Sequence, residues 1–237
     1  MIEIKNVTKK YGEKVALDDL TLTIESGDIF AFVGHNGAGK TTCIKCMTDI
    51  IEFDSGDILY DGISIKTSPI KCKKQLAYIP DNPDLYEFLK GIDYLNFVAD
   101  IYEMDETRGA KIEEYADEFE LKEYLANPIS SYSHGMKQKL AIISALIHEP
   151  KYIILDEPFV GLDPIASHKL KTYMKNLTKK GTAIFFSTHV LEVAEKLCNK
   201  LAIIKAGKLV ITGEMGKVLK NKSLEDIFME LANEELN

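Results

Sequence analysis

The segment from residue 29 to residue 42 constrains the fold of this chain more than any other. Five apolar residues, 29 to 33, predict a buried strand, and the residues that follow, Gly-His-Asn-Gly-Ala-Gly-Lys-Thr-Thr, match the pattern G-x-x-x-x-G-K-[ST]. A helix-like stretch opens at Lys40. In such a unit, glycines let backbone N–H groups surround a β-phosphate, and the helix N-terminus favours negative charge. The sequence therefore predicts a phosphate-binding loop between a strand and a helix.

Side chains of this loop would complete the phosphate site. The ammonium group of Lys40 is expected to reach the β- and γ-phosphate oxygens, and the hydroxyl group of Thr41 to face Mg²⁺. The residues expected to contact the bound phosphates are Gly34, His35, Asn36, Gly37, Ala38, Gly39, Lys40, Thr41 and Thr42.

Composition argues against several other classes of protein. A chain of 237 residues can bury a sizeable core without disulfides or a structural metal. Its net charge of −8 would repel phosphate backbones, so no nucleic-acid partner is expected. The four cysteines, Cys43, Cys46, Cys72 and Cys198, form no paired C-x-x-C knuckles, and we interpret them as core thiols of a reducing compartment.

Neither an export signal nor a membrane span is predicted. The N-terminus begins directly with strand-like alternation and lacks a basic region followed by an apolar one. The apolar run from 140 to 147 is far shorter than the roughly 18 residues needed to span a bilayer. We therefore expect a soluble chain.

Alternating strand-like and helix-like segments predict a largely parallel sheet with helices on both faces. Residues 1–25 are expected to form antiparallel strands. Helical spacing from about 93 to 125 predicts an inserted helical lobe whose acidic residues face solvent. Near the end we expect a hairpin of residues 201–204 and 209–212, and then a mixed tail from Lys217 onward.

A second motif places two carboxylates after an apolar strand. Residues 152–155 predict a buried strand, and Asp156 and Glu157 follow it directly. Asp156 would hold Mg²⁺ through water, as a Walker-B aspartate does, whereas Glu157 would point elsewhere and could polarise an attacking water. A buried strand with an acidic turn is common, so the functional interpretation depends on its combination with the phosphate loop.

A third motif, Ser-Ser-Tyr-Ser-His-Gly-Met-Lys-Gln from residue 130 to 138, opens a further helix. With this motif the chain resembles the ATP-binding-cassette (ABC) ATPase family. This motif and three further segments carry the resemblance, which covers residues 1 to about 213. Tyr132 to Met136 is similar to the L-S-G-G-Q signature, Gly161 to Asp163 to the D-loop, Ser187 to His189 to the switch-histidine segment, and Tyr11 to the adenine-stacking aromatic residue.

The resemblance implies a fold and a shared site. The implied fold is α/β, a P-loop NTPase core with a mostly parallel sheet, an N-terminal antiparallel β subdomain and an inserted α-helical subdomain. One ATPase domain is expected over residues 1–237, with the helical subdomain at about 82–145 and a C-terminal hairpin and tail at about 200–237. The cofactors implied are ATP and Mg²⁺.

Two subunits of the family pair head to tail. Ser133 and the Gly135 amide of one chain would then contact the γ-phosphate bound by the other, and a helix N-terminus there would replace an arginine finger. The chain has one arginine, Arg108, which lies far along the sequence from the phosphate loop. His189 would hydrogen-bond the same γ-phosphate.

The sequence departs from the family pattern at three positions. His134 and Met136 stand where the signature has glycine and glutamine, which could change the affinity of dimer closure. Asp81 stands where the Q-loop has glutamine. A carboxylate can still bind Mg²⁺, although it adds negative charge beside the triphosphate.

The function implied is that of an ATP-hydrolysing subunit of a membrane transporter. A transmembrane permease subunit and a second ATPase subunit, identical or closely homologous, would be its partners, and it would lie in the cytoplasm on the inner face of the cell membrane. The signature and acidic Q-loop resemble those of multidrug and peptide-antibiotic exporters. One alternative is a soluble ABC ATPase of an assembly, translation or repair complex, and another is a P-loop kinase, which would leave Ser133 and His189 unexplained.

Overall fold

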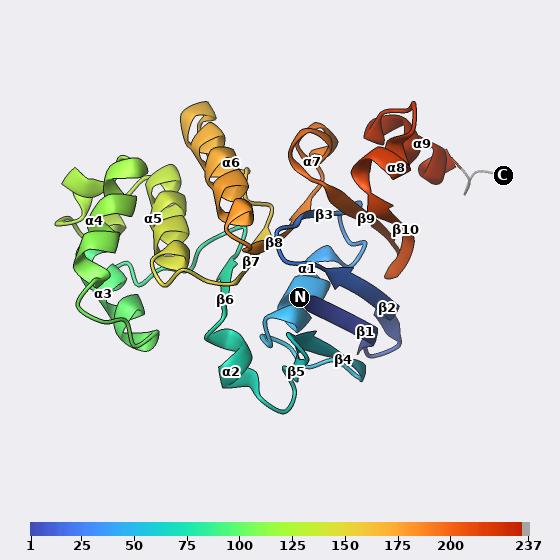
Figure 1. Ribbon diagram of the computed structural model, residues 1–237, viewed down its shortest axis with the longest axis horizontal. Coiled ribbons are helices and arrows are strands. Elements are labelled where there is room, and N and C mark those ends of the chain that lie inside the picture. Colours follow the sequence, from blue (N-terminus) through green and yellow to red (C-terminus); the bar gives the residue numbers. More distant parts are fainter. Residues whose placement is uncertain (234–237) are drawn as a thin grey trace.

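The structure of the protein is a computed structural model that describes residues 1–233. Within these residues, ten strands form two sheets. The strands are β1 (Ile2–Tyr11), β2 (Lys14–Ile24), β3 (Ile29–Val33), β4 (Ser55–Tyr60), β5 (Ile63–Ser64), β6 (Leu76–Ile79), β7 (Tyr152–Asp156), β8 (Ala183–Thr188), β9 (Lys200–Lys205) and β10 (Lys208–Glu214). One sheet is antiparallel with the order β2-β1-β4-β5, and the other has the order β10-β9-β3-β8-β7-β6 (Figure 1).

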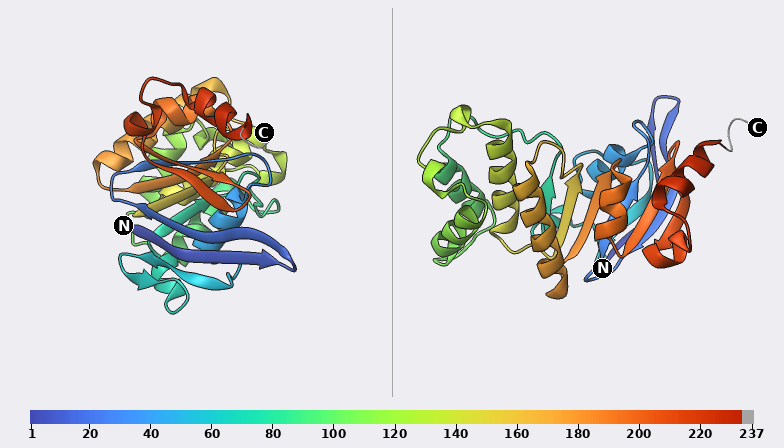
Figure 2. Two further views of the ribbon diagram at one scale, coloured as in Figure 1. Left: turned by 90° about the vertical axis from the view of Figure 1, so that its right-hand side faces the viewer. Right: turned by 90° about the horizontal axis from the view of Figure 1, so that it is seen from above.

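Helices cover the larger sheet and extend past it. They are α1 (Lys40–Met47), α2 (Pro69–Lys73), α3 (Gly91–Ile101), α4 (Arg108–Glu118), α5 (His134–Leu146), α6 (Pro164–Lys179), α7 (Leu191–Leu197), α8 (Met215–Leu219) and α9 (Leu224–Asn233), with short 3₁₀ helices η1 (Lys122–Tyr124) and η2 (Ile129–Ser131). Figure 2 shows α3, α4 and α5 gathered at one end of the molecule, and α8 and α9 at the opposite end.

The larger sheet is parallel except at one edge, as the sequence predicts. Strand β3 pairs in parallel with β8 and β9, and β7 pairs in parallel with β6 and β8. Every residue of β3, β7 and β8 is buried, because helices or the second sheet cover both faces. The predicted hairpin is β9 and the antiparallel edge strand β10.

Alternation along β3 divides its side chains between two hydrophobic cores. Phe30 and Phe32 pack with α1 and the antiparallel sheet, whereas Ala31 and Val33 belong to the core that faces the helices on the other side. This division follows from the two-residue period of a strand. The phosphate loop therefore leaves a strand that is anchored on both faces.

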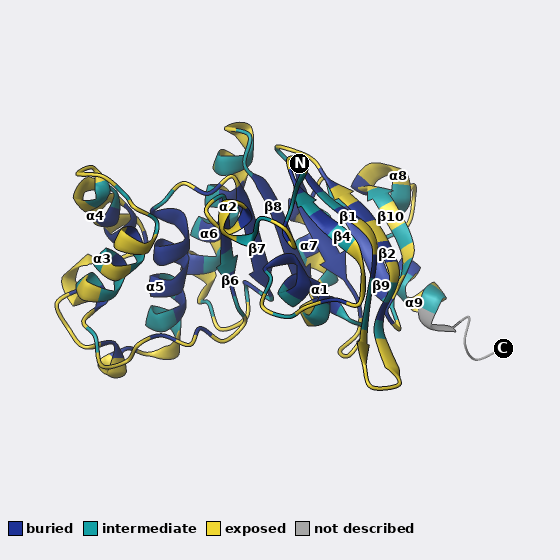
Figure 3. Cartoon of the chain, turned by 90° about the horizontal axis from the view of Figure 1, so that it is seen from below, coloured by how far each residue is buried: buried dark blue, intermediate teal, exposed yellow. Residues whose placement is uncertain are grey.

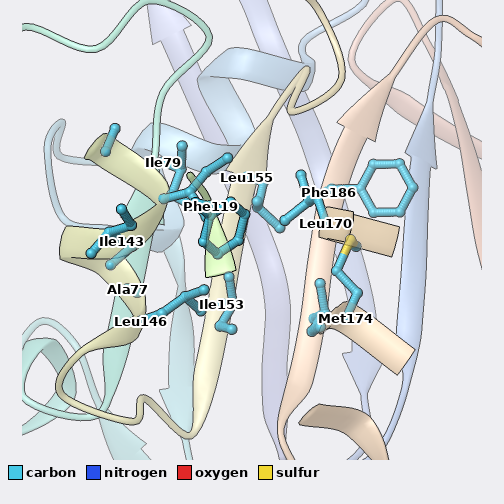
Figure 4. Close-up of a cluster of buried hydrophobic side chains, with 14 of the residues drawn as sticks. Ala77, Ile79, Phe119, Ile143, Leu146, Ile153, Leu155, Leu170, Met174 and Phe186 are labelled. Carbon is cyan, nitrogen blue, oxygen red and sulfur yellow. The ribbon is translucent and has the colours of Figure 1, made fainter. Parts of the chain in front are cut away.

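The second core joins the sheet to α6. Figure 4 shows Ile79, Leu155 and Phe186, one from each of three neighbouring strands, beside Leu170 and Met174 of α6. All five side chains are at most 3% exposed. The carboxyl ends of β6, β7 and β8 are thereby held side by side at one edge of the sheet, where the predicted acidic residues follow.

The inserted helices carry their charges on the outside, as predicted. In α4, Ile112, Tyr115 and Ala116 are buried at helical spacing, while the acidic residues between them are exposed. Figure 3 shows the exposed outer faces of α3 and α4 and the buried strands of the sheet. The α/β fold class, with its antiparallel N-terminal sheet and inserted helices, is confirmed.

Sequence periodicity left some helices unpredicted. Helices α2 and α7 have five and seven residues, too few for a repeating apolar pattern. The predicted mixed tail forms α8 and α9, although α8 begins at Met215, and residues 234–237 of the predicted tail lie outside the described residues.

The four cysteines are buried and free, as predicted. Among residues 1–233, no helix is both long enough and apolar enough to cross a membrane.

Candidate functional site

The predicted phosphate loop connects the buried end of β3 to the first turn of α1. Gly39 precedes the helix with a φ of 114°, a left-handed conformation that favours glycine. A Cβ atom at Gly34 would lie 2.6 Å from the carbonyl oxygen of Ile204, and one at Gly39 would lie 2.6 Å from that of Ala16. The backbone of the loop is therefore packed directly against β9 and β2.

The loop lines a cavity of about 620 Å³, large enough for a nucleotide. The predicted site residues that line it are Tyr11, His35, Asn36, Gly37, Gly39, Lys40, Thr41, Thr42, Asp81, Asp156 and Glu157. Gly34 and Ala38 belong to the loop but form no part of this lining, since Gly34 faces Ile204 and Ala38 is buried in the core.

Lys40 is held by the loop itself. Its Nζ atom donates hydrogen bonds to the carbonyl oxygens of Gly34 (2.7 Å) and His35 (3.4 Å). It also lies 3.7 Å from Oε1 of Glu157, and the side chain is only 7% exposed. A buried ammonium group needs such partners, and an incoming phosphate could replace them at the same position.

Both predicted carboxylates line the cavity, which differs from the expectation that Glu157 points elsewhere. Asp156 ends β7 and accepts a hydrogen bond from the hydroxyl of Ser187. Glu157 has a φ of 49°, so the alternation of the strand ends there, and its amide donates to the carbonyl oxygen of Ser187 (3.2 Å). A left-handed residue directly after the strand thus brings two successive acids to one cavity.

His189 reaches the site through Glu157. Its Nδ1 atom lies 3.0 Å from Oε2 of Glu157, and its amide donates to the same oxygen at 3.3 Å. His189 follows β8 and Glu157 follows β7, so the parallel pairing of these strands aligns them. The imidazole is half-exposed and forms no part of the cavity lining.

Negative charge accumulates beside the loop. Burial, together with the charges of Asp156 and Glu157, raises the pKa of Asp81 above its ordinary value. Burial and the nearby Asp156 and Asp81 raise the pKa of Tyr78 to about 12. In residues 1–233, no three His, Cys, Asp or Glu side chains form a group that could hold a metal ion alone. The carboxylate oxygens of Asp81 and Asp156, which line the same cavity, are of the kind that Mg²⁺ takes together with oxygen atoms of a bound phosphate.

The predicted signature residues lie apart from this cavity. Ser133 caps α5, and its hydroxyl accepts a hydrogen bond from the amide of Met136 at 3.3 Å. His134 packs on Gly161, where a Cβ atom would meet its Nε2 at 2.5 Å, so the predicted signature and D-loop segments are in contact. Ser133 is exposed, and neither it nor Gly135 lines the cavity of its own chain.

Tyr11 stands at the rim of the cavity, at the end of β1. Its side chain is 51% exposed, and the Nζ atom of Lys9 lies 5.2 Å from its ring centroid. Sequence reasoning did not find other lining residues, notably Lys14 and the turn Ala206-Gly207. The turn joins β9 to β10, and both of its residues are left-handed, with a φ of 47° at Ala206 and 81° at Gly207.

A family model and curated relatives match this chain. The model described as "ABC transporter" matches residues 17–160. The ABC-type transporter ATP-binding protein EcsA of Bacillus subtilis (strain 168) is 32% identical over 241 residues, which cover 99% of this chain and 98% of that protein. The linearmycin resistance ATP-binding protein LnrL of the same organism is 31% identical over 217 residues, covering 90% and 69%.

Solved structures show the same architecture. A structure titled as the ATP-binding subunit of an ABC transporter has a TM-score of 0.94 and 34% identity, covering 98% of this chain and 99% of that one. A dimeric ATP-binding cassette in a post-hydrolysis state, bound to ADP and Pi, has a TM-score of 0.82 over 91% of this chain and 99% of that one. Its identity of 23% supports the fold alone.

Proposed function

Since the chain belongs to the family of ABC transporter ATP-binding proteins, we propose that it is the ATP-hydrolysing subunit of a membrane transporter. The observation that carries this proposal is the convergence of a phosphate loop, Lys40 and two carboxylates on one cavity. We place one ATPase domain over residues 1–237, with its helical subdomain at about 82–145 and its C-terminal hairpin and tail at about 200–237.

Binding of ATP and Mg²⁺ is assigned to one end of the sheet. The loop amides and Lys40 would hold the phosphates, and the half-exposed ring of Tyr11 would stack on the base. The residues present fit Mg²⁺, because Thr41, Asp156 and Asp81 offer oxygen atoms to the same cavity. When bound, Mg²⁺ would neutralise charge on the β- and γ-phosphate oxygens.

Hydrolysis is assigned to Glu157 and His189. The Glu157 carboxylate would accept a proton from the water that attacks the γ-phosphorus, while the bond to the leaving oxygen breaks. His189, which contacts Oε2 of Glu157, would orient that carboxylate and hydrogen-bond the γ-phosphate. Entry of phosphate would draw Lys40 away from Glu157, leaving the carboxylate available for the water.

A second ATPase subunit would complete each site. Ser133 and the Gly135 amide lie at the exposed N-terminus of a 13-residue helix, which attracts anions, yet they lie apart from the cavity of their own chain. A head-to-tail dimer would bring them to the γ-phosphate of the partner. ATP would then close the dimer, and hydrolysis would reopen it.

The other proposed partner is a transmembrane permease subunit. Tyr86, Phe88 and Phe97 form an exposed aromatic group, in which the Tyr86 ring lies 5.9 Å from that of Phe88 and 5.7 Å from that of Phe97. The Phe88 side chain is 81% exposed. Exposed aromatic clusters are typical of protein interfaces, and this one would receive a cytoplasmic helix of the permease. The chain would lie in the cytoplasm, at the inner face of the membrane.

We extend the proposal to an exporter. Two features support that direction: the Ser-His-Gly-Met form of the signature, which resembles exporter ATPases, and the similarity to a relative named for linearmycin resistance. This extension rests on analogy with related proteins.

The primary test measures ATP binding and hydrolysis by the purified chain. Lys40→Ala should abolish hydrolysis and weaken binding of a non-hydrolysable ATP analogue in calorimetry, because it removes a buried cation from the phosphate site. The matched control is Lys45→Ala, which removes a charge from the same helix outside the cavity lining. Equal binding by Lys40→Ala and Lys45→Ala would remove this loop from the proposal.

Isolation of the chain from solubilised membranes together with a membrane-spanning protein would support the transporter assignment, and its recovery only from the soluble fraction would contradict it.

A further inference from the structure

The C-terminal helix α9 contacts the phosphate loop through one pair of rings. The ring of Phe228 lies 4.4 Å from that of His35, centroid to centroid, at an interplanar angle of 51°. His35 also lines the nucleotide cavity. The space around the pair is nearly filled, since the void beside it measures only about 10 Å³. One loop residue is therefore shared between the nucleotide site and α9.

Both ends of α9 are fixed to the body of the protein. At its start, Ser223 and Asp226 cap the helix reciprocally, and the amide of Leu224 donates to Oε2 of Glu195 in α7 at 2.8 Å. At its far end, Nζ of Lys205 in β9 donates to the carbonyl oxygen of Leu231 at 2.6 Å. Leu224 and Ile227 are buried. The helix is thus a packed element rather than a loose extension.

The same strand hairpin supports the loop and the helix. The amide of Gly207, in the β9–β10 turn, donates to the carbonyl oxygen of Ala38 in the loop at 2.9 Å. Ala206 and Gly207 also line the cavity. Figure 1 shows α9 beside β9 and β10 at this end of the molecule. Displacement of α9 would therefore act on the loop at two places, through His35 directly and through the hairpin.

We propose that Phe228 is a positioning residue for nucleotide binding: it holds His35, and with it the phosphate loop, in the arrangement that receives the phosphates. The carbonyl oxygen of His35 is one of the two that hold Nζ of Lys40, so the position of His35 bears on the phosphate-binding ammonium. A loop that is already ordered loses less conformational entropy on binding. By linkage, nucleotide must in turn stabilise the docked state of α9. This inference rests on the proposed binding of ATP at the loop.

The first experiment compares affinities for a non-hydrolysable ATP analogue by calorimetry on the full chain. Phe228→Ala should weaken binding about two- to tenfold, the range that an aromatic pair contributes. Phe228→Tyr should restore wild-type affinity because it keeps the ring. Met229→Ala is the matched control, since Met229 lies in the same helix but is 54% exposed, and its affinity should not change. Wild-type binding with unaltered affinity in Phe228→Ala would overturn the inference, whereas no binding by the wild type would instead overturn the proposed function.

The second experiment separates positioning from simple loss of the helix. Hydrogen exchange of peptides covering residues 224–231 should slow when the analogue saturates the wild type. At a concentration that saturates His35→Ala this response should vanish, because the sequence of α9 is intact but its ring contact with the loop is lost. The losses of binding free energy caused by Phe228→Ala and by His35→Ala should be strongly non-additive in the double variant, because each substitution removes the same contact. An exchange response that persists in His35→Ala, or losses that add fully, would show that α9 and the loop act independently.

Discussion

Nδ1 of His189 lies 3.0 Å from Oε2 of Glu157, although 32 residues separate them in the chain. The contact exists because β7 and β8 are adjacent and parallel, so that the residues after each strand meet at one edge of the sheet. On the other side of the carboxylate, Oε1 lies 3.7 Å from Nζ of Lys40. Glu157 thus stands between a cation of the phosphate loop and the histidine proposed to contact the γ-phosphate.

Because of this position, Glu157 is the first residue that we would substitute. Glu157→Gln keeps the shape of the side chain but removes the proton acceptor, so ATP binding should persist while hydrolysis slows. General-base assistance of about 10²- to 10⁴-fold corresponds to roughly 3–5.5 kcal/mol of activation free energy. Phosphate release measures the rate, and gel filtration with ATP should show accumulation of a nucleotide-bound dimer. Turnover near that of the wild type would take Glu157 out of this role.

How far the sequence predicts this site depends on how local each feature is. The loop after β3 and the acids after β7 follow from short patterns, because one strand and the residues after it carry the whole signal. The left-handed conformation of Glu157 has no such signal, since most glutamates avoid this conformation. It occurs together with a hydrogen bond from the Glu157 amide to the carbonyl oxygen of Ser187, thirty residues away.

Long-range packing accounts for the remaining omissions. Phe228 is far from His35 in the sequence, and no sequence pattern around either residue predicts the contact between their rings. The same applies to Gly207, which reaches the phosphate loop because β9 happens to pair with β3. Periodicity predicts that a segment is helical or extended, but the neighbours of its side chains are fixed by how the segments pack.

The exposed aromatic group tests the proposed contact with a permease. Phe88→Asp should reduce co-purification with the membrane partner at least about tenfold, because exposed aromatic anchors dominate interface energetics. Nucleotide binding by the isolated chain should stay unchanged. Ile70→Asp is the matched control, since Ile70 is 71% exposed on α2, away from this group. Normal recovery of the partner with Phe88→Asp would place the interface elsewhere.

His148 gives the stability of the fold a dependence on pH. Its ring stacks on Tyr102 with centroids 3.6 Å apart, and burial lowers its pKa to about 4. This folded-state pKa lies below the ordinary histidine pKa of about 6.5. The contribution of neutral His148 to the stability of the fold is therefore complete above about pH 6.5. The contribution is then lost as the pH falls toward 4, by at most about 3 kcal/mol.

The matching variant is His148→Phe, which keeps a ring against Tyr102 but cannot take up a proton. The difference in free energy of unfolding between wild type and variant, measured by urea denaturation, should be constant above about pH 7 and should move in favour of the variant between about pH 6.5 and 4.5. His168→Phe, at an exposed position of α6, controls for the loss of an imidazole elsewhere. Parallel stability curves for wild type and His148→Phe would contradict the assignment.

Ser133 provides the most discriminating test, because it should act on the nucleotide of the opposite subunit. Ser133→Glu would set a negative charge against a γ-phosphate across the dimer interface and prevent closure. Affinity of the monomer for ATP should scarcely change, since Ser133 lies outside the cavity of its own chain, whereas ATPase activity should collapse. A Ser133→Glu chain that dimerises with ATP as well as the wild type would contradict the shared site.

Mixing Ser133→Glu with Lys40→Ala chains separates a shared site from a site within one chain. In a head-to-tail heterodimer, the loop of the Lys40→Ala chain faces the altered Ser133 of its partner, so that site carries both defects. The other site combines the intact loop of the Ser133→Glu chain with the intact Ser133 of the Lys40→Ala chain. If subunits exchange and one working site suffices, activity absent from either variant alone should return on mixing, up to about half the wild-type rate per dimer formed. Mass spectrometry of the mixture confirms that heterodimers are present. Heterodimers without activity would mean that both residues serve the nucleotide within a single chain, or that the two sites must work together.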